Sequence, residues 1–369
     1  MRRIPGDVQA TIRGGLLTTL LVAALVPARL AAQDSTLHAS WSGYLDTYYA
    51  YDFGRPASID RVYTTQAARH NEFNVNLAHV AVSLSGDRVR GRFALQAGTS
   101  VQANYAGEPS VGGYSGSSLS RHIQEATAGY RVGSGLWVDA GVYFSYIGGE
   151  GWISRDNANY TRSLVAEYSP YYLSGVKLTW QRPGSPVTVQ LHVMNGWQNI
   201  SETNSDKAVG GRVDWQVTQA LSLGYAGFVG NELPDSVPSR MRVFNQVLGK
   251  WSLPGGAYVQ GQVDLGHQGG SDWWGWVVSA HVPAAPRVAV AARFEGYRDP
   301  EQVILATGTP NGFKGLGASL GLDVSAPCGL LWRTEGRVLH TTADLFPKDG
   351  VANSSRSNVL LVSSLALTL

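Results

Sequence analysis

The chain has 369 residues and a formal net charge of +2, and only 15% of its residues are charged, whereas an ordinary soluble domain has about 25%. No apolar run after residue 32 approaches the roughly 18 residues of a membrane-spanning helix, and the 11 Trp, 17 Tyr and 9 Phe argue against a disordered chain. With 44 glycines as well, the composition favours a β-rich protein with many turns and an uncharged surface.

The first 32 residues are typical of a secretory signal peptide. Arginines precede an apolar stretch from Leu16 to Val26, and Leu30–Ala32 supplies small residues for cleavage. The alternative is an uncleaved amphipathic segment. Cleavage would leave 33–39 as a short N-terminal segment before a first strand near Ser40. It would also change the net charge from +2 to −1, because residues 1–32 contain four arginines and one acid; this charge does not suggest a nucleic-acid partner.

From residue 40 to residue 369 the chain divides into segments of about ten residues in which polar and apolar residues alternate. Ten residues is the length of a tilted membrane strand. In 89–97, for example, Arg90, Arg92 and Gln96 share one face, and Val89, Phe93 and Leu95 share the other. The same alternation recurs at 136–146, 187–193 and 316–323.

The connections between these segments alternate in length. Seven short ones, rich in the Gly and Pro of tight turns, lie at Ser85–Arg88, Gly133–Gly135, Arg182–Pro186, Thr218–Ala220, Pro254–Gly256, Pro283–Pro286 and Pro327–Gly329. Eight longer, polar ones lie around 54–70, 103–122, 148–170, 195–206, 230–240, 268–272, 298–312 and 343–356. We therefore predict an all-β transmembrane up-and-down barrel of about sixteen antiparallel strands. In a bacterial outer membrane the turns, both termini and 33–39 would be periplasmic, and the long loops extracellular.

A soluble β-sandwich is the competing interpretation, because its strands also alternate. A sandwich covers its solvent-facing side with charge, whereas the apolar face here is smooth. Aromatic residues also lie close to the short turns and point outward by parity, as in a membrane-interface girdle. These aromatics are Tyr130, Trp180, Trp215, Trp251 and Trp332. The membrane barrel is the favoured interpretation.

Several ordered motifs resemble one known family. They are GYLDTYYAYDF (43–53), RHNEFNVNL (69–77), RGRFALQAGTS (90–100), IQEATAGY (123–130), LWVDAGVYFSYIGGE (136–150), NYTRSLVAEYSPYYLSGVKL (159–178) and NGWQNI (195–200). Together they resemble the outer-membrane β-barrel porins described as OmpL-like, densely from 43 to 215 and by strand pattern alone beyond. One departure is the terminal Leu369, where such barrels usually end in an aromatic residue.

The resemblance implies an outer-membrane protein of a Gram-negative-type bacterium that contacts the lipid bilayer, lipopolysaccharide and the outer-membrane assembly machinery. It implies passive diffusion of small hydrophilic solutes through a water-filled barrel, and a sixteen-stranded barrel is wide enough for an aqueous channel. By analogy with sixteen-stranded general porins, we also expect a homotrimer.

The sequence contains no catalytic pattern. It lacks HExxH, a Walker-type loop and a CxxC pair, and its eight histidines are scattered. His192, at an inward strand position, is more typical of a polar lumen group than of a metal ligand. We therefore expect neither enzyme activity nor a cofactor or metal.

Charges at inward positions are nearly balanced, which predicts no strong ion preference. The basic ones are Arg90, Arg92, Arg131, Lys177, Arg212, Arg293, Arg333 and Arg337, and the acidic ones are Glu125, Asp139, Asp214, Asp264, Glu295, Asp323 and Glu335. Each could line the pore and tune it, or brace the wall by pairing across strands. Arg333, Glu335 and Arg337, on one strand, look most like a bracing ladder.

The third long connection, 148–170, combines a glycine-rich start with dense charges and aromatics, and a loop of this length is usually functional or disordered. In general porins the third loop folds inward and narrows the pore, and the resemblance implies the same here. We expect a constriction formed by Glu150, Trp152, Arg155, Asp156 and Arg162. The alternative is an outward loop that packs on its neighbours.

Two other functions remain open at this point. A closed or narrow barrel could serve surface binding or adhesion through its loops. A substrate-selective sugar or anion channel would need an aromatic track or a basic patch in the lumen, which Tyr143, Tyr146, Trp152 and Tyr160 could begin to form.

Overall fold

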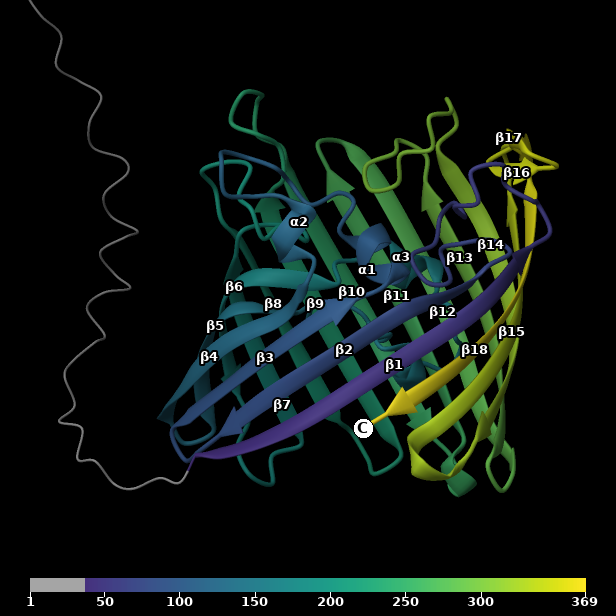
Figure 1. Cartoon of the computed structure of the whole chain (residues 1–369). Helices are drawn as coiled ribbons and strands as arrows, with labels where there is room; N and C mark the ends of the chain where they lie inside the picture. The colour runs from purple at the N-terminus through teal and green to yellow at the C-terminus, as the bar shows by residue number, and fades with distance from the viewer. Residues whose placement is uncertain (1–36) are drawn as a thin grey trace, which may run out of the picture. The chain divides into compact units, whose positions relative to one another are not determined.

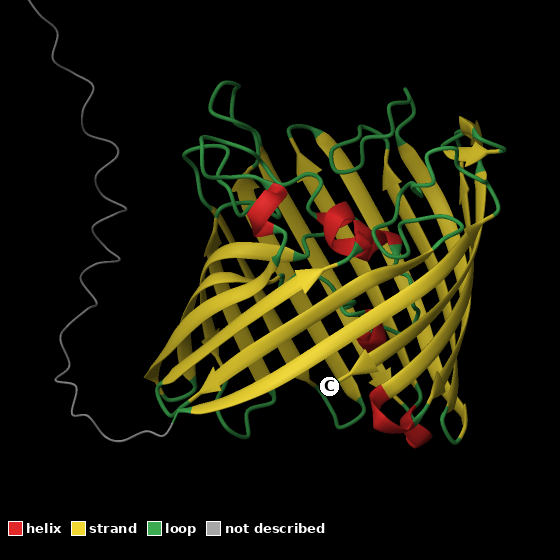
Figure 2. Cartoon of the chain, viewed as in Figure 1, coloured by secondary structure: helices red, strands yellow, loops and turns green. Residues whose placement is uncertain are grey.

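Sixteen antiparallel strands form a closed barrel in the computed structural model, which describes residues 37–369 (Figures 1 and 2). The expected signal peptide lies outside the described residues. The strands are β1 (His38–Asp52), β2 (Phe73–Ser85), β3 (Val89–Ala97), β4 (Ile123–Gly133), β5 (Leu136–Phe144), β6 (Tyr172–Trp180), β7 (Val187–Met194), β8 (Ala208–Gln216), β9 (Leu221–Asn231), β10 (Met241–Ser252), β11 (Tyr258–Gln268), β12 (Ser271–Ala285), β13 (Val288–Asp299), β14 (Phe313–Ser325), β15 (Leu330–Thr341) and β18 (Ser357–Thr368). The first strand thus begins two residues before the expected Ser40.

Neighbours in the chain pair along the whole sheet, and β1 pairs with β18 to close it, with Tyr44 opposite Thr368. The C-terminus lies at the end of the barrel that has the short turns (Figure 1). We call this end the turn side and the opposite end the loop side. The sixteen-stranded up-and-down barrel predicted from the sequence is confirmed.

All seven short turns connect strands where the sequence predicts them. The prediction of a long connection around 268–272 is wrong, because only Gly269 and Gly270 separate β11 from β12. Both have positive φ, 60° and 93°, which glycine adopts without steric cost, so this loop-side connection is a tight turn. The connection from β15 to β18 contains a small two-stranded sheet of β16 (Phe346–Lys348) and β17 (Val351–Ser355).

Side chains alternate between the two faces of the wall, because successive residues of a strand point to opposite sides of a sheet. The outward face is apolar and exposed, as for Phe294 at 61% and Leu320 at 73%. The turn-side aromatics Trp215, Trp251 and Trp332 are also exposed and outward-facing. This is the surface that a hydrocarbon environment requires.

The helices are short and lie in loops. They are α1 (Thr99–Asn104), α2 (Ser117–Ser120) and α3 (Leu164–Glu167), with single 3-10 turns at Ser154–Asp156, Pro254–Gly256 and Pro327–Gly329. In Figures 1 and 2, α1, α2 and α3 gather towards the loop side of the barrel. Within residues 37–369, no helix combines the length and the apolar character needed to cross a membrane.

The largest apolar core lies inside the barrel rather than between layers. Inward side chains from many strands form it, among them Met194, Phe228, Phe244, Trp273, Val277, Tyr297, Phe313 and Leu339. Loop side chains complete it, namely Ile147, Leu164, Val165, Leu305 and Leu345. The loops therefore pack into the lumen and fill part of it.

Candidate pore constriction

The connection between β5 and β6, residues 145–171, folds into the barrel, and we call it the third loop. The Ser145 N–H donates to the Tyr171 carbonyl oxygen at 3.0 Å, so the two ends of the loop lie side by side. All residues from 157 to 167 are buried. The third loop therefore does not point outward, which was the alternative expectation.

The first part of the third loop crosses to the wall formed by β10 and β11. The N–H groups of Gly148 and Gly149 donate to the Oε1 atoms of Gln246 and Gln262, each at 2.8 Å. The amide nitrogens of both glutamines donate to Asp264, at 2.9 and 3.0 Å. Because Asp264 accepts from these nitrogens, the amide oxygens face the loop. Gly148 has φ 107°, a conformation that favours glycine.

Arg212 on β8 binds the same part of the loop. Its Nη1 donates to the carbonyl oxygens of Tyr146 and Gly148 at 2.7 and 3.0 Å, and its Nε donates to Asp214 at 2.8 Å. Arg212 and Asp214 face inward as expected for pore-lining residues, and Arg212 also fixes the backbone of the loop.

The middle of the third loop lies against β15. Arg333 donates to the carbonyl oxygens of Ser154, Asn157 and Ala158, the last two at 3.0 and 2.8 Å. Its Nε donates to Asp323 at 2.9 Å. Arg333 is 1% exposed, so its guanidinium interacts with the loop backbone and one carboxylate rather than with solvent. A buried guanidinium with such partners is a strong anchor.

The segment before α3 lies against a second set of buried charges. Thr161 donates through its N–H and Oγ1 to the Glu335 carboxylate, both at 2.7 Å. Arg293 donates to the carbonyl oxygen and the hydroxyl of Thr161. The Leu164 N–H donates to Glu295 at 2.6 Å. These wall residues are at most 1% exposed. They satisfy loop N–H and carbonyl groups that would otherwise be buried without partners.

Arg337 completes this charge cluster by donating to Glu295 at 2.7 Å. Arg333, Glu335 and Arg337 each pair with a charged residue of another strand, the arrangement expected of a bracing ladder. Arg333 and Glu335 also contact the third loop, a role that strand parity alone does not reveal, whereas Arg337 contacts Glu295 on β13.

Asp46 on β1 is an anchor that the sequence reasoning missed. Its carboxylate accepts hydrogen bonds from Ser154 at 3.0 Å, from Asn76 at 2.8 Å and from Tyr160 at 3.3 Å. It is fully buried. The available signal was the presence of acids, Asp46 and Asp52, at inward positions of the aromatic segment 43–53.

Three of the five expected constriction residues lie at accessible or partly accessible positions. Asp156 and Arg155 are exposed, and Arg155 reaches the turn side, where it donates to the Gly329 carbonyl oxygen at 3.3 Å. Glu150 is half-buried and accepts from the Ser163 N–H at 2.7 Å. Burial raises the pKa of the Glu150 carboxyl, and the positive charge of Arg293 opposes this shift.

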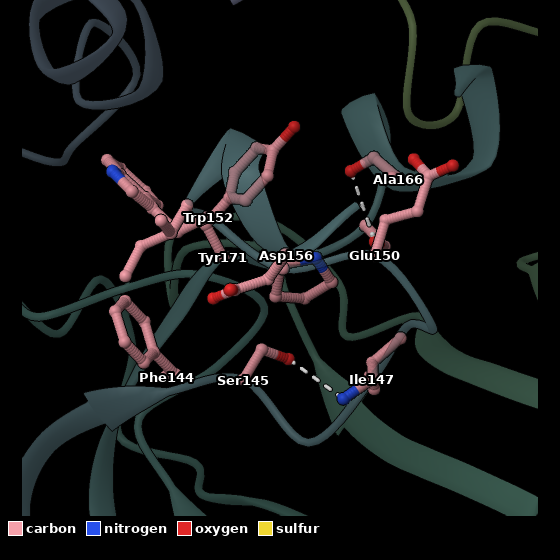
Figure 3. Close-up of a pocket in the computed structure, with 12 residues that line it drawn as sticks. Phe144, Ser145, Ile147, Glu150, Trp152, Asp156, Ala166 and Tyr171 are labelled. Carbon is pink, nitrogen blue, oxygen red and sulfur yellow. Dashed lines mark hydrogen bonds between the residues drawn. The ribbon is translucent and has the colours of Figure 1, made fainter. Parts of the chain in front are cut away.

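The other two lie inside the loop. Trp152 is 5% exposed, and Arg162 is fully buried with its guanidinium 3.7 Å from the centre of the Tyr171 ring. Neither side chain faces open lumen, which differs from the sequence expectation. The reason is that a 27-residue loop folded on itself forms its own interior. Figure 3 shows Trp152, Tyr171 and Asp156 around a cavity of about 170 Å³.

A second cavity, of about 230 Å³, lies between the third loop and the wall of β8–β12. Glu150 and Asp156 line it from the loop. From the wall it is lined by Arg212, Asp214, Lys250, Gln260 and Gln262, among others. Polar groups thus face one another across this space, along the inner face of β8–β12.

The remaining expected pore-lining residues lie on β3–β6. Arg90 pairs with Asp139 at 2.6 Å, and Arg92 pairs with Glu125. Among the residues that the structure describes, Lys177 has no carboxylate within 4.0 Å, and its Nζ lies 4.9 Å from the centre of the Tyr143 ring.

The aromatics that could have formed a sugar track are all buried. Tyr143, Tyr146, Trp152 and Tyr160 are at most 5% exposed, because they pack within the loop or under it. Within residues 37–369, no group of three or more His, Cys, Asp or Glu is placed to bind a metal ion.

The family model described as putative beta-barrel porin-2, OmpL-like, matches residues 38–369. The chain belongs to this porin family. It is therefore an outer-membrane porin, as the resemblance of its N-terminal half implied. No curated protein matches the sequence.

Solved structures share the fold of this porin at low sequence identity. The anion-selective porin from Comamonas acidovorans is 12% identical with a TM-score of 0.57, over 90% of this chain and 100% of that one. The outer membrane channel DcaP of Acinetobacter baumannii is 12% identical with a TM-score of 0.61, over 90% and 97%. OmpT of Vibrio cholerae, in its trimer form, is 10% identical with a TM-score of 0.53, over 90% and 100%.

Proposed function

We propose that this porin passes small hydrophilic solutes by passive diffusion along one side of its lumen, and that the third loop sets the width of the path. The path runs between the loop and the wall of β8–β12. The start of the loop touches this wall through Arg212, Gln246 and Gln262, and its later residues are anchored on β13, β15 and β1.

The observation that carries this proposal is the polar cavity beside the loop. Its lining includes Glu150 and Asp156 from the loop and Arg212, Lys250 and Gln262 from the wall. Water and small polar solutes find hydrogen-bond partners on both sides of such a space. On the far side of the loop, by contrast, Arg293 and Glu335 are buried and paired.

The charges around the cavity support weak ion selectivity. Arg212 and Lys250 are basic, whereas Glu150, Asp156 and Asp214 are acidic. Charges of both signs around one cavity offset one another, and salt screens exposed charges. We therefore expect small cations and small anions to pass at comparable rates.

Liposome swelling with sugars of graded size tests the proposal. The purified porin should admit monosaccharides and exclude larger oligosaccharides. Deleting 152–160 should raise the size limit, because that segment occupies the lumen. Deleting 111–114, which is exposed in the connection from β3 to β4, is the matched control and should leave the limit unchanged. An unchanged limit in both variants would contradict the role of the third loop.

A closed barrel that binds partners through its loops is the second candidate. The apolar core inside the lumen favours it, because Leu164, Val165, Leu305 and Leu345 pack against inward wall residues. The same swelling assay separates the two functions. A closed barrel admits no sugar of any size.

The proposal includes a homotrimer, the form named for the similar V. cholerae protein. An outward polar patch on β15, β18 and β1 supports it. There Ser363 accepts from the Trp332 Nε1 at 2.8 Å and from Thr334 at 3.3 Å, and Thr47 donates to the Leu365 carbonyl oxygen at 3.1 Å. Polar groups on a face that otherwise meets lipid suit a protein contact. Chemical cross-linking in intact membranes should give trimers, and only monomers would contradict the assembly.

A further inference from the structure

The outward face of the barrel has almost no ionisable side chains. Along all sixteen strands of the described chain, the outward positions contain Asp, Glu, Lys, Arg or His only at the loop-side ends of β11–β15. These residues are His267, Asp272, Arg298, Lys314 and His340. Such a concentration on adjacent strands at one rim points to a partner at that rim.

Arg298 and Lys314 are the centre of this group. They lie directly opposite each other across the β13–β14 pair. Side chains in that relation have Cβ atoms about 4.5–5.5 Å apart, and like charges there destabilise a sheet. Both side chains are basic. Among residues 37–369, no carboxylate lies within 4.0 Å of either one, so the repulsion has no internal compensation.

The acid among these five outward-facing residues is paired with a histidine instead. Asp272 lies 2.7 Å from His267 on β11. Asp299, next to Arg298 in sequence, points inward and accepts from the N–H groups of Val303 and Ile304 at 2.9 and 2.8 Å. The two opposed bases are therefore available to an anion from outside the chain.

Two further side chains frame the pair. Trp274 lies opposite Arg298 on the β12 side and is 41% exposed. His340 on β15 is the diagonal neighbour of Lys314, since it lies opposite Leu316. Its Nδ1 lies 2.9 Å from the Ser357 hydroxyl. Figure 1 shows β12–β15 next to one another, with these ends towards the loop side.

An exposed apolar surface continues from the bases towards the middle of the barrel wall. Phe294, Leu316 and Leu320 are 61%, 60% and 73% exposed. Gly296 lies between Trp276 and Leu316, and a Cβ there would come within 2.5 Å of the Trp276 Nε1. The Trp276 ring therefore lies flat on the wall, which leaves a smooth apolar track below the charged rim.

We propose that Arg298 and Lys314 bind the phosphate of a phosphorylated lipid headgroup in the loop-side leaflet, with the acyl chains of that lipid lying over Phe294, Leu316 and Leu320. Arg and Lys are phosphate-binding side chains, and basic clusters at a membrane interface bind anionic headgroups. An anion between the two bases would convert their repulsion into two attractive contacts.

The occupant is the phosphorylated glycolipid of lipopolysaccharide. The loop side of an outer-membrane barrel faces the outer leaflet, where this lipid resides. The geometry matches it in two respects, because phosphate meets the charged rim and acyl chains meet the apolar track. A free phosphate ion would use only the rim.

Native mass spectrometry of the full-length mature porin in detergent tests the site. The protein is titrated with lipid A, with enzymatically dephosphorylated lipid A and with inorganic phosphate. We expect one tightly bound lipid A per chain at this site, and binding weaker by about tenfold or more in R298Q/K314Q. Dephosphorylated lipid A should bind to the native protein only as weakly as lipid A binds to that variant.

The matched control is R88Q/R182Q, which removes two exposed basic side chains from the turn side. It should bind lipid A like the native protein, as should the charge-conserving R298K/K314R. The single variants R298Q and K314Q give the same comparison if the double variant does not fold, as judged by heat-dependent gel mobility. Unchanged lipid A affinity in the glutamine variants would overturn the proposal. Inorganic phosphate that binds as tightly as lipid A would overturn it too.

Discussion

Two groups of inward charges use the same residue types in opposite ways. On β3–β6, the pairs Arg90–Asp139 and Arg92–Glu125 leave the arginines 35% and 31% exposed. On β13–β15, Arg293, Glu295 and Glu335 are at most 1% exposed and bind the third loop. The difference comes from what lies against each wall, which is solvent-accessible lumen in the first case and protein backbone in the second.

The comparison teaches that an inward position does not define a pore-lining role. A charge next to water is stabilised by hydration and contributes little to stability when paired. A charge covered by a loop has to be paired and hydrogen-bonded, and it then determines where the loop lies. The following predictions test this distinction, from the largest expected effect to the smallest.

R293Q should have the largest effect on stability. It removes the guanidinium between Glu295 and Glu335 and the bonds to Thr161. Loss of one partner from a buried ion pair costs about 3–5 kcal/mol. Urea unfolding of the barrel in lipid vesicles, followed by tryptophan fluorescence, measures the change. A loss below about 1 kcal/mol would mean that the buried cluster does not hold the loop.

D46N should have an intermediate effect. The Asp46 carboxylate accepts from Ser154, Asn76 and Tyr160, and the amide replaces one acceptor oxygen with a donor. A buried group left without its partner costs about 1–3 kcal/mol. The same unfolding measurement checks the value. D214N is the comparison variant, because the Asp214 side chain on β8 is 37% exposed, and it should lose less.

D156N and K250Q should change ion selectivity in opposite directions. Both residues are exposed and line the cavity beside the loop. D156N should favour anions and K250Q should favour cations. Each exposed charge contributes about 1 kcal/mol or less, which is less than about a tenfold change in the permeability ratio. Reversal potentials in a salt gradient give the sign, and shifts in the same direction would contradict the proposed path.

R92Q should have the smallest effect. Arg92 is 31% exposed, and its partner Glu125 is 11% exposed. Water can replace most of this contact, so we expect a loss of about 1 kcal/mol or less. R92Q and R293Q both replace an arginine by glutamine, so their losses of unfolding free energy compare the two walls directly. Equal losses would remove the distinction between them.

The barrel could be predicted from the sequence because its period and its turns are local features. Alternation along 89–97 or 187–193 gives the strands, and the Gly- and Pro-rich turns give their number. The tight turn at Gly269 and Gly270 was expected to be a loop, since polar neighbours on both sides resemble one. A tight turn is distinguished from a loop here only by the β11–β12 pairing, which continues as far as Gln268 and Ser271.

The site could be predicted only in part, because it depends on contacts between residues far apart in the chain. Glycines and charges identified the third loop, but the partners of Thr161 and Ser154 lie on β1, β13 and β15. The resemblance could not show that Arg162 stacks on Tyr171 inside the loop. The apolar lumen core was also missed, although inward residues such as Phe228 and Phe244 carry a signal for it.

The central claim is that the third loop, anchored by buried charges, limits flow through the lumen. Single-channel conductance in planar bilayers tests it most directly, with the chain lacking 152–160 compared with the intact chain. The deletion removes the anchored backbone of Ser154, Asn157 and Ala158. We predict a clearly larger conductance after this deletion and no change after deletion of 111–114. An unchanged conductance in the chain lacking 152–160 would contradict the claim.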